Sequence, residues 1–266
     1  MIQLRILFIG DIVGRPGREC VGRVLPSLQT EHSLDLVVAN GENAAGGVGL
    51  TPMTADEIFA TGVDVITLGN HTWAHSEIIP YFDTDVAVVR PLNYPPGAPG
   101  RGAISVRTKS GVRVVVINLL GRLFMEALDC PFRGADAALA ELTPGGVVIV
   151  DMHAEATSEK QALGYYLDGR VSAVCGTHTH TPTADARVLP AGTLYVSDVG
   201  MVGPQNSVIG MDSASAIRRF MTKPAARGVK VDKLTGPVQF NSVLLTVDAT
   251  TGQGVGIERL DTIQAE

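Results

Sequence analysis

LRILFIGDIVGRPGRECVGRVLPSLQT, residues 4–30, is the stretch from which the fold can first be inferred. The apolar run at residues 4–9 predicts a buried strand, and Gly10 and Asp11 follow it as a loop. Apolar residues at helical intervals then predict a helix from Pro16 to about residue 30, with proline near the helix start, where it is tolerated. Strand, loop and helix in this order are typical of an α/β protein.

The same pattern recurs along the chain. Residues 34–39 form a second predicted strand, a helix follows from about residue 52, and residues 63–68 form a third strand. Further strands are expected at residues 103–107, 112–120, 147–152, 171–175, 193–197 and 238–247, and further helices at 75–82, 135–142, 158–167 and 213–221. These strands are too many for one open sheet, and the later ones lack helices between them. We therefore expect two packed sheets.

Composition and charge limit the classes of function that the chain can have. The chain has 266 residues, 45% hydrophobic and 18% charged, with no change of composition around the proline-rich residues 93–100, so we expect a single domain over residues 1–266. The net charge of −6 with scattered Lys and Arg argues against a stable complex with long nucleic acid. No apolar run is long enough for a membrane helix, and the N-terminal apolar stretch is too short for a signal peptide. Three isolated cysteines favour a reducing compartment, so we expect a cytoplasmic protein.

Polar residues follow five of the predicted strands. They are Asp11; Glu42 and Asn43; Asn70 and His71; His153; and His178 with His180. In α/β sheets, ligands bind outside the carboxyl ends of strands, so these five clusters are expected to converge. Alone, each has a simpler interpretation: Asp11 as a turn or helix-cap aspartate, His153 as a core histidine. His178 and His180 are two residues apart, so on an extended segment both would face the same way, a geometry that suits metal binding.

The residue types predict the kind of metal. Imidazole nitrogens mixed with carboxylate and amide oxygens suit Mn, Fe, Zn or Co. Seven candidate ligands are too many for one catalytic ion that keeps an open position, and they suit two ions that share a bridging carboxylate. Glu155, Asp151 and Asp198 are candidates for orienting the ligating imidazoles, with plain hydrogen bonding as the alternative.

The order of these motifs resembles that of a known superfamily. GD, GEN, GNH, a lone His and GTHTH, spanning residues 10–180, are similar to the motifs of the calcineurin-like metallophosphoesterases. Val13 stands where that superfamily has a histidine, and Glu42 where it has an aspartate; both departures resemble the YmdB-like branch of bacterial cyclic-nucleotide phosphodiesterases. RPLNYPPGAPGRG (residues 90–102) and SDVGMVGPQNSVIG (residues 197–210) are also similar to that branch. The resemblance implies a four-layer α/β/β/α sandwich of two mixed β-sheets flanked by helices.

The resemblance also implies roles for individual residues. One metal would be held by Asp11, Asn43 and His180, and the second by Asn70, His153 and His178. Glu42 would bridge both ions, and His71 would protonate the leaving oxygen. Because the first site is rich in oxygen ligands, Fe or Mn is expected ahead of Zn or Co.

The implied reaction is hydrolysis of a small cyclic nucleotide through attack of a metal-bridging hydroxide. The favoured substrates are 2′,3′-cyclic monophosphates, giving 3′-nucleotides, with 3′,5′-cyclic ones as a second class. Two alternatives stay open: a phosphomonoesterase or RNA-end phosphoesterase, and a non-catalytic regulatory protein with a structural metal centre. The oligomeric state is open too, a homo-oligomer included, as is the role of residues 93–102 and 200–210 in substrate access or subunit contacts.

Overall fold

The computed structural model describes residues 2–142, 145–222 and 231–265. Two six-stranded mixed sheets form its centre. The first has the order β15 (Gly254–Arg259), β14 (Ser242–Asp248), β1 (Gln3–Ile9), β3 (Leu36–Asn40), β4 (Val65–Thr67), β5 (Val88–Val89). The second has the order β10 (Arg187–Val188), β11 (Leu194–Val196), β9 (Ala173–Thr177), β8 (Val147–His153), β7 (Arg113–Leu120), β6 (Ala103–Arg107). In the first sheet, β1, β3, β4 and β5 pair in parallel, and β14 and β15 add antiparallel pairs at one edge. In the second sheet, parallel pairs occupy the middle and antiparallel pairs lie at both edges.

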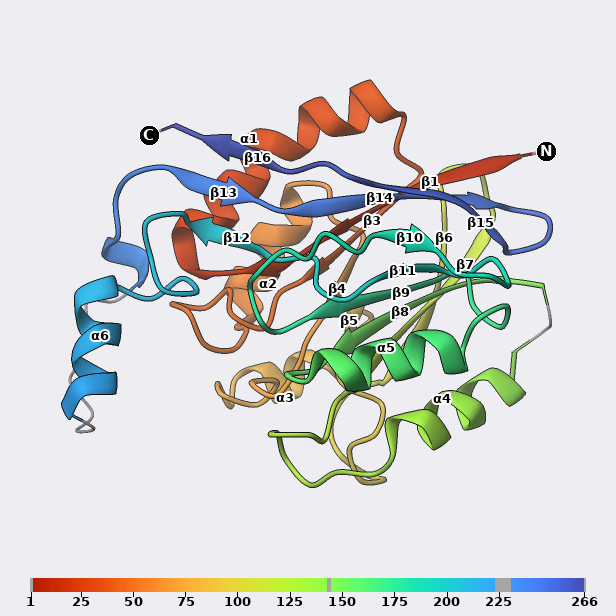
Figure 1. The fold of residues 1–266 in the computed structure, drawn as a ribbon, viewed down its shortest axis with the longest axis horizontal. Coiled ribbons are helices and arrows are strands. Elements are labelled where there is room, and N and C mark those ends of the chain that lie inside the picture. Colours follow the sequence, from red (N-terminus) through yellow and green to blue (C-terminus); the bar gives the residue numbers. More distant parts are fainter. Residues whose placement is uncertain (1, 143–144, 223–230, 266) are drawn as a thin grey trace.

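Helices cover the outer faces of both sheets. The helices are α1 (Gly14–His32), α2 (Pro52–Ala60), α3 (Ile78–Tyr81), α4 (Pro131–Ala140), α5 (Thr157–Tyr166) and α6 (Ser213–Thr222), with a 3₁₀ turn at Val231–Lys233. In Figure 1, α1 lies above the first sheet, α4 and α5 lie below the second, and α6 stands apart at the left. Across the described residues, no helix combines the length and the apolar character needed to cross a membrane.

The alternation of side chains along the strands explains the layers. In β1, Leu4, Ile6 and Phe8 point into a core that lies between the two sheets, whereas Leu7 and Ile9 pack into the core shared with the helices of the first sheet. β7 alternates in the same way between the inter-sheet core and the core under α4 and α5. The predicted four-layer α/β/β/α arrangement is confirmed.

A small third sheet was not predicted. It has the order β16 (Thr262–Gln264), β13 (Val238–Phe240), β12 (Met201–Pro204), β2 (Asp11–Ile12). β1 and β14 pair directly, but their continuations β2 and β13 are separated by β12. The single strand predicted at residues 238–247 is therefore wrong: Asn241 divides it into two strands that belong to different sheets.

Gly10 lies at the corresponding break between β1 and β2. A Cβ atom on Gly10 would lie 2.1 Å from the carbonyl oxygen of Gly200, a distance at which the backbones could not coexist. Its amide donates to Asn241 O at 3.1 Å, and the amide of Asp11 donates to Gly200 O at 3.0 Å. This close contact lets β12 enter beside Asp11, so the break places a candidate ligand at the end of the first strand.

Most other predicted elements lie within a few residues of the observed ones. The helix predicted at residues 75–82 is wrong in extent, because only Ile78–Tyr81 is helical and the preceding residues form turns. The remaining unpredicted strands, β5, β10, β15 and β16, are short or lie at sheet edges, where the apolar pattern is weak.

Candidate metal centre

The carboxyl ends of the central strands bring the candidate ligands together. Asp11 lies in β2, Glu42 and Asn43 follow β3, Asn70 follows β4, His153 ends β8, and His178 and His180 follow β9. β3 and β4 are parallel neighbours in the first sheet, and β8 and β9 are parallel neighbours in the second. The candidate site therefore lies where the same edges of the two stacked sheets meet.

Glu42, His153 and His178 form the tightest part of this site. Glu42 Oε1 lies 3.1 Å from His153 Nε2, and His153 Nε2 lies 3.0 Å from His178 Nδ1. Each of the three residues offers a ligand atom within 4.8 Å of the other two, a spacing that could hold a metal ion.

Asp11 and His180 lie on the other side of the same cluster. Asp11 Oδ1 is 3.7 Å from His180 Nε2 and 4.0 Å from His153 Nδ1, and Asp11 Oδ2 accepts a hydrogen bond from the His178 amide at 3.1 Å. Asp11 therefore contacts residues assigned by resemblance to both metals.

Asn70 lies at the edge of this cluster. A Cβ atom on the preceding Gly69 would lie 2.1 Å from Glu42 Oε2 and 2.3 Å from His153 Nε2, so only glycine allows the chain to pass so close. The Asn70 side-chain oxygen is buried, and so is Asp11 Oδ1; within the described part of the chain neither has a hydrogen-bond partner. Buried oxygens are rarely left without a partner, and a bound cation at each oxygen would supply one. The donor set thus fits transition-metal ions.

Asn43 differs from the arrangement that the resemblance implies. Its amide nitrogen lies 3.0 Å from His180 Nε2, and its oxygen lies 3.0 Å from His71 Nδ1. An amide nitrogen is not a metal ligand, so Asn43 must turn its side-chain amide over to place the oxygen beside His180.

A second layer of hydrogen bonds orients His153. The Thr177 hydroxyl donates to Asp151 Oδ1 at 2.7 Å, so its oxygen accepts from His153 Nδ1 at 2.8 Å. This leaves Nε2 as the nitrogen that faces Glu42, as a metal ligand requires. Asp151 therefore acts on the imidazole through Thr177, a residue that the sequence analysis did not single out although it lies within GTHTH.

His180 and His178 are oriented in the same manner. His180 Nδ1 donates to the Ile209 carbonyl at 2.8 Å, which leaves Nε2 towards Asp11. His178 Nε2 lies 3.1 Å from Glu155 Oε2, which leaves Nδ1 towards the cluster. Of the three suggested orienting residues, Glu155 contacts an imidazole directly, whereas Asp198 bonds to the backbone and hydroxyl of Thr179 instead.

The backbone around these two histidines is unusual. His178 has φ 101° and His180 has φ 62°, both in the left-handed region that residues with a Cβ atom seldom adopt. The expectation that they share one side of an extended segment is wrong. The chain curls at each histidine, and the two rings reach the cluster for that reason.

Burial and neighbouring charges raise some pKa values in the cluster and lower others. Burial raises the pKa of Asp11 to about 6. Burial opposes the charged form of His153, but the carboxylates of Glu42, Asp11 and Asp151 outweigh it and raise the His153 pKa to about 9. Burial also favours a raised pKa for Glu42, yet His153 and His71 hold that pKa well below its usual value. Burial, reinforced by His153, lowers the pKa of His178 to about 3.

His71 lies at the mouth of the cluster. Its Nδ1 is 3.0 Å from Asn43 Oδ1 and 3.3 Å from Glu42 Oε1, while its side chain is 36% exposed. Nε2 is thus the ring nitrogen left for a bound molecule. Val13 is buried against Met201 and Val231, so the place of the superfamily's extra histidine is part of an apolar contact.

Several loops surround these residues. The segment at 200–210 contains β12 and contacts the cluster through Ile209. Trp73 packs edge-on against Tyr94, with ring centroids 4.5 Å apart.

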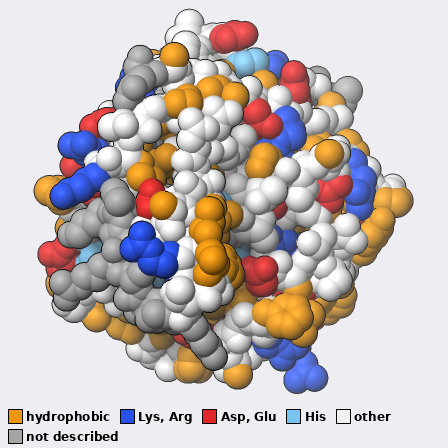
Figure 2. All heavy atoms as spheres, turned by 60° about the vertical axis from the view of Figure 1, so that its left-hand side comes forward, with side chains coloured by type: hydrophobic (Ala, Val, Ile, Leu, Met, Phe, Trp, Pro, Cys, Tyr) orange, Lys and Arg blue, Asp and Glu red, His pale blue; other side chains and the backbone are white. Residues whose placement is uncertain are grey.

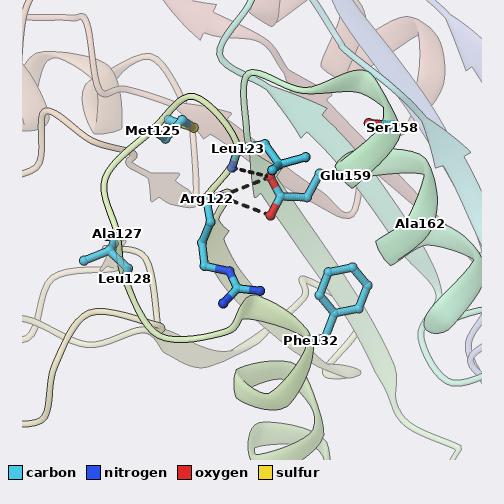
Figure 3. Close-up of a pocket in the computed structure, with 9 residues that line it drawn as sticks. All are labelled: Arg122, Leu123, Met125, Ala127, Leu128, Phe132, Ser158, Glu159 and Ala162. Atoms are coloured by element: carbon cyan, nitrogen blue, oxygen red, sulfur yellow. Dashed lines mark hydrogen bonds between the residues drawn. The ribbon is translucent and has the colours of Figure 1, made fainter.

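A cavity of about 550 Å³ lies under the loop after β7, where Glu159 accepts hydrogen bonds from the amides of Arg122 and Leu123 (Figure 3). None of the candidate ligands lines this cavity.

Comparisons with known proteins show which family and which structures the chain is similar to. The family model described as YmdB-like protein matches residues 7–260. The chain is 46% identical over 260 residues to the 2′,3′-cyclic-nucleotide 2′-phosphodiesterase of Bacillus subtilis, which covers 97% of this chain and 96% of that protein. A hypothetical protein from Thermus thermophilus has a similar structure, with a TM-score of 0.90 and 43% identity, covering 99% of this chain and 100% of that one. A structure described as a novel phosphatase from Mycoplasma pneumoniae has a TM-score of 0.91 and 32% identity, covering 100% and 95%.

Proposed function

The chain belongs to the YmdB-like protein family, and on that premise we propose that it is a metal-dependent phosphodiesterase of cyclic nucleotides. The favoured substrates are 2′,3′-cyclic nucleoside monophosphates, with 3′,5′-cyclic ones as a second class. The proposal depends above all on one observation: Glu42 lies within 3.1 Å of His153 and 3.3 Å of His71, so one buried carboxylate connects a candidate ligand to the candidate proton donor. The activity named for the Bacillus subtilis relative, 46% identical, supports the substrate class.

Two divalent ions would be held by this chain's own side chains. Asp11, Asn43 and His180 would hold one, Asn70, His153 and His178 the other, and Glu42 would bridge them. When bound, such ions supply Lewis acidity and an activated water. Fe or Mn suits the oxygen-rich first site better than Zn or Co.

Charge favours a small anionic substrate. Two divalent ions bring four positive charges against the two negative charges of Asp11 and Glu42, so the centre would attract a phosphodiester although the whole chain carries −6. On the face that Figure 2 shows, acidic and basic side chains are interspersed with hydrophobic ones. Such a surface supports a small-molecule substrate over long nucleic acid. A cytoplasmic location fits three cysteines that form no disulfide.

His71 would deliver a proton to the leaving oxygen. With both ring nitrogens protonated, Nδ1 stays paired with the carboxylate of Glu42, and Nε2 is free to donate. A 2′,3′-cyclic ester would then lose its bond to the 2′ oxygen, which takes this proton, and the product would be a 3′-monophosphate.

Turnover by metal-loaded protein tests the proposal. Protein reconstituted with Mn²⁺ or Fe²⁺ is incubated with 2′,3′-cyclic and 3′,5′-cyclic nucleotides, and the products are separated by chromatography. We expect 3′-nucleotides from the 2′,3′ substrates. Protein that carries two metal ions and cleaves neither class would contradict the proposal.

A phosphomonoesterase is the second candidate, because the Mycoplasma pneumoniae neighbour is described as a phosphatase. Rates on p-nitrophenyl phosphate and on bis-p-nitrophenyl phosphate separate the two activities. A phosphodiesterase cleaves the bis ester faster, and a strong preference for the monoester would favour the phosphatase.

A further inference from the structure

A buried lysine has no part in the functions proposed so far. Lys160 lies on α5 with 1% of its side chain exposed. Its ammonium group donates to Asp198 Oδ2 at 2.7 Å and to the carbonyl oxygen of Thr177 at 2.7 Å. Burying a charged pair carries a large desolvation cost, and a hydrophobic pair of similar volume is often as stable. The pair therefore calls for an explanation other than stability.

Asp198 forms hydrogen bonds with Thr179, the residue that follows His178. Its Oδ2 accepts hydrogen bonds from the Thr179 amide at 3.0 Å and from the Thr179 hydroxyl at 2.8 Å. Lys160 and Asp198 thus hold the residues directly before and directly after His178. Thr179 also directly precedes His180, so the pair fixes the segment that carries both imidazoles.

Asp198 reaches the Asp11 segment as well. Its Oδ1 accepts from the Gly200 amide at 2.8 Å, and the carbonyl oxygen of Gly200 accepts from the amide of Asp11 at 3.0 Å. Arg259 of β15 holds the backbone of Asp198, because its guanidinium group donates to the Asp198 carbonyl oxygen at 3.3 Å. One carboxylate therefore connects the segments that carry Asp11, His178 and His180.

We propose that Lys160 and Asp198 are positioning residues that hold His178 and His180 in the orientation in which they bind metal. This inference depends on the metal centre under Proposed function. The left-handed φ of 101° at His178 and 62° at His180 supplies the physical reason. Such conformations persist only where surrounding bonds over-determine them. Lys160 and Asp198 make three hydrogen bonds to Thr177 and Thr179, and a fourth joins Lys160 to Asp198.

The test compares the metal affinity of variants, each measured while it is folded. Full-length protein is prepared as wild type, Lys160→Met and Asp198→Asn, with Leu163→Ala as the control. Leu163 is fully buried one turn further along α5, and no hydrogen bond joins its side chain to the histidine segment, so its truncation destabilises the same helix by cavity formation. Mn²⁺ binding is measured by calorimetry at a temperature at which circular dichroism shows every variant to be folded.

We expect Lys160→Met and Asp198→Asn to bind Mn²⁺ about 10–100-fold more weakly than wild type, as is typical when partners of metal ligands are lost. Leu163→Ala should keep wild-type affinity despite its lower melting temperature. Excess Mn²⁺ should restore most of the kcat of Lys160→Met with little change in KM, because the residue acts through the metal ligands.

A milder variant covers the case in which neither ion-pair variant folds. Thr179→Val removes one hydroxyl donor to Asp198, and we expect it to weaken Mn²⁺ binding severalfold while its melting temperature stays near that of wild type. Wild-type affinity in Thr179→Val and Lys160→Met, or an equal loss of affinity in Leu163→Ala, would overturn the inference. If wild type binds two ions and is active while these variants match it, only this inference fails; if wild type binds no metal, the proposed function fails first.

Discussion

At the scale of single residues, two histidines of one cluster have different pKa values because their surroundings differ. His153 lies among three carboxylates and has its pKa raised to about 9, although burial opposes the charge. His178 is buried beside His153, and its pKa is lowered to about 3. Without metal, the cluster thus holds its proton on His153, on the nitrogen that faces Glu42 at 3.1 Å.

Metal binding should therefore release a proton and strengthen with pH. Below pH 9, His153 is protonated in the metal-free protein, and an ion that binds Nε2 must displace this proton. We expect Mn²⁺ affinity to rise about tenfold per pH unit between pH 7 and 8.5, and to fall more steeply below pH 6, where Asp11 is protonated too. Calorimetry in buffers of different ionisation enthalpy counts the released protons. Affinity independent of pH in this range would show that His153 is neutral before metal binds.

His71→Ala should separate catalysis from metal binding. Because His71 is expected to act as the proton donor and not as a ligand, its loss should lower kcat on 2′,3′-cyclic nucleotides by ~10²–10⁴-fold while metal content stays unchanged. Steady-state kinetics and elemental analysis on the same preparation measure both. A loss of metal together with activity would make His71 a ligand instead, and full biological effect without turnover would favour the regulatory alternative.

At the scale of elements, the break between β1 and β2 places Asp11. The two large sheets follow from apolar alternation, but the third sheet requires that β12 enter between β2 and β13. That entry is possible because Gly10 has no Cβ to meet the Gly200 carbonyl. A substitution at Gly10 should consequently affect both stability and the ligand beside it.

We expect Gly10→Ala to lower the free energy of unfolding by ~1–3 kcal/mol, as overpacking of a well-packed interior does, and to weaken metal binding. Urea denaturation and Mn²⁺ titration measure the two effects. Gly256→Ala in β15 is the matched control, because nothing lies within 4 Å of its added Cβ. Equal stability of the two variants would mean that β12 can shift without cost.

The sequence predicts the positions of the candidate ligands better than their geometry. Apolar runs mark the strand ends at Ala39, Leu68 and Met152 because burial imposes the pattern locally. The division at Asn241 leaves no such mark, since it is caused by a strand 40 residues earlier in the chain. The left-handed histidines depend on Lys160 and Asp198 in the same way. Even so, Lys160 lies on the buried face of its helix together with Leu163 and Gly164. A charged residue on such a face indicates, from the sequence alone, a buried polar contact.

At the scale of the whole molecule, the centre depends on both sheets at once. Apart from Asp11 in β2, its candidate ligands follow or end β3 and β4 of one sheet and β8 and β9 of the other. The core between the sheets includes side chains of β1, β3, β7 and β8. Neither sheet could keep its half of the centre if the inter-sheet core opened.

We infer that residues 1–266 fold as one cooperative unit and expect a single urea transition. Far-ultraviolet circular dichroism reports the helices and strands, and the fluorescence of Trp73, the only tryptophan in the chain, reports the surroundings of the candidate centre. The two curves should coincide, as two-state unfolding requires. Separate midpoints would divide the chain into independently folding parts.

The hydrogen bond from His180 Nδ1 to the carbonyl oxygen of residue 209 does not depend on the side chain at position 209. Because the acceptor is a main-chain carbonyl, the imidazole keeps its orientation whatever side chain stands at position 209. Ile209 is 50% exposed, and its φ of 47° suits glycine or asparagine better than a β-branched residue. Position 209 can therefore change in size and polarity while His180 keeps its hydrogen bond, so the orientation of this candidate ligand is decoupled from the residue type at the position that supports it.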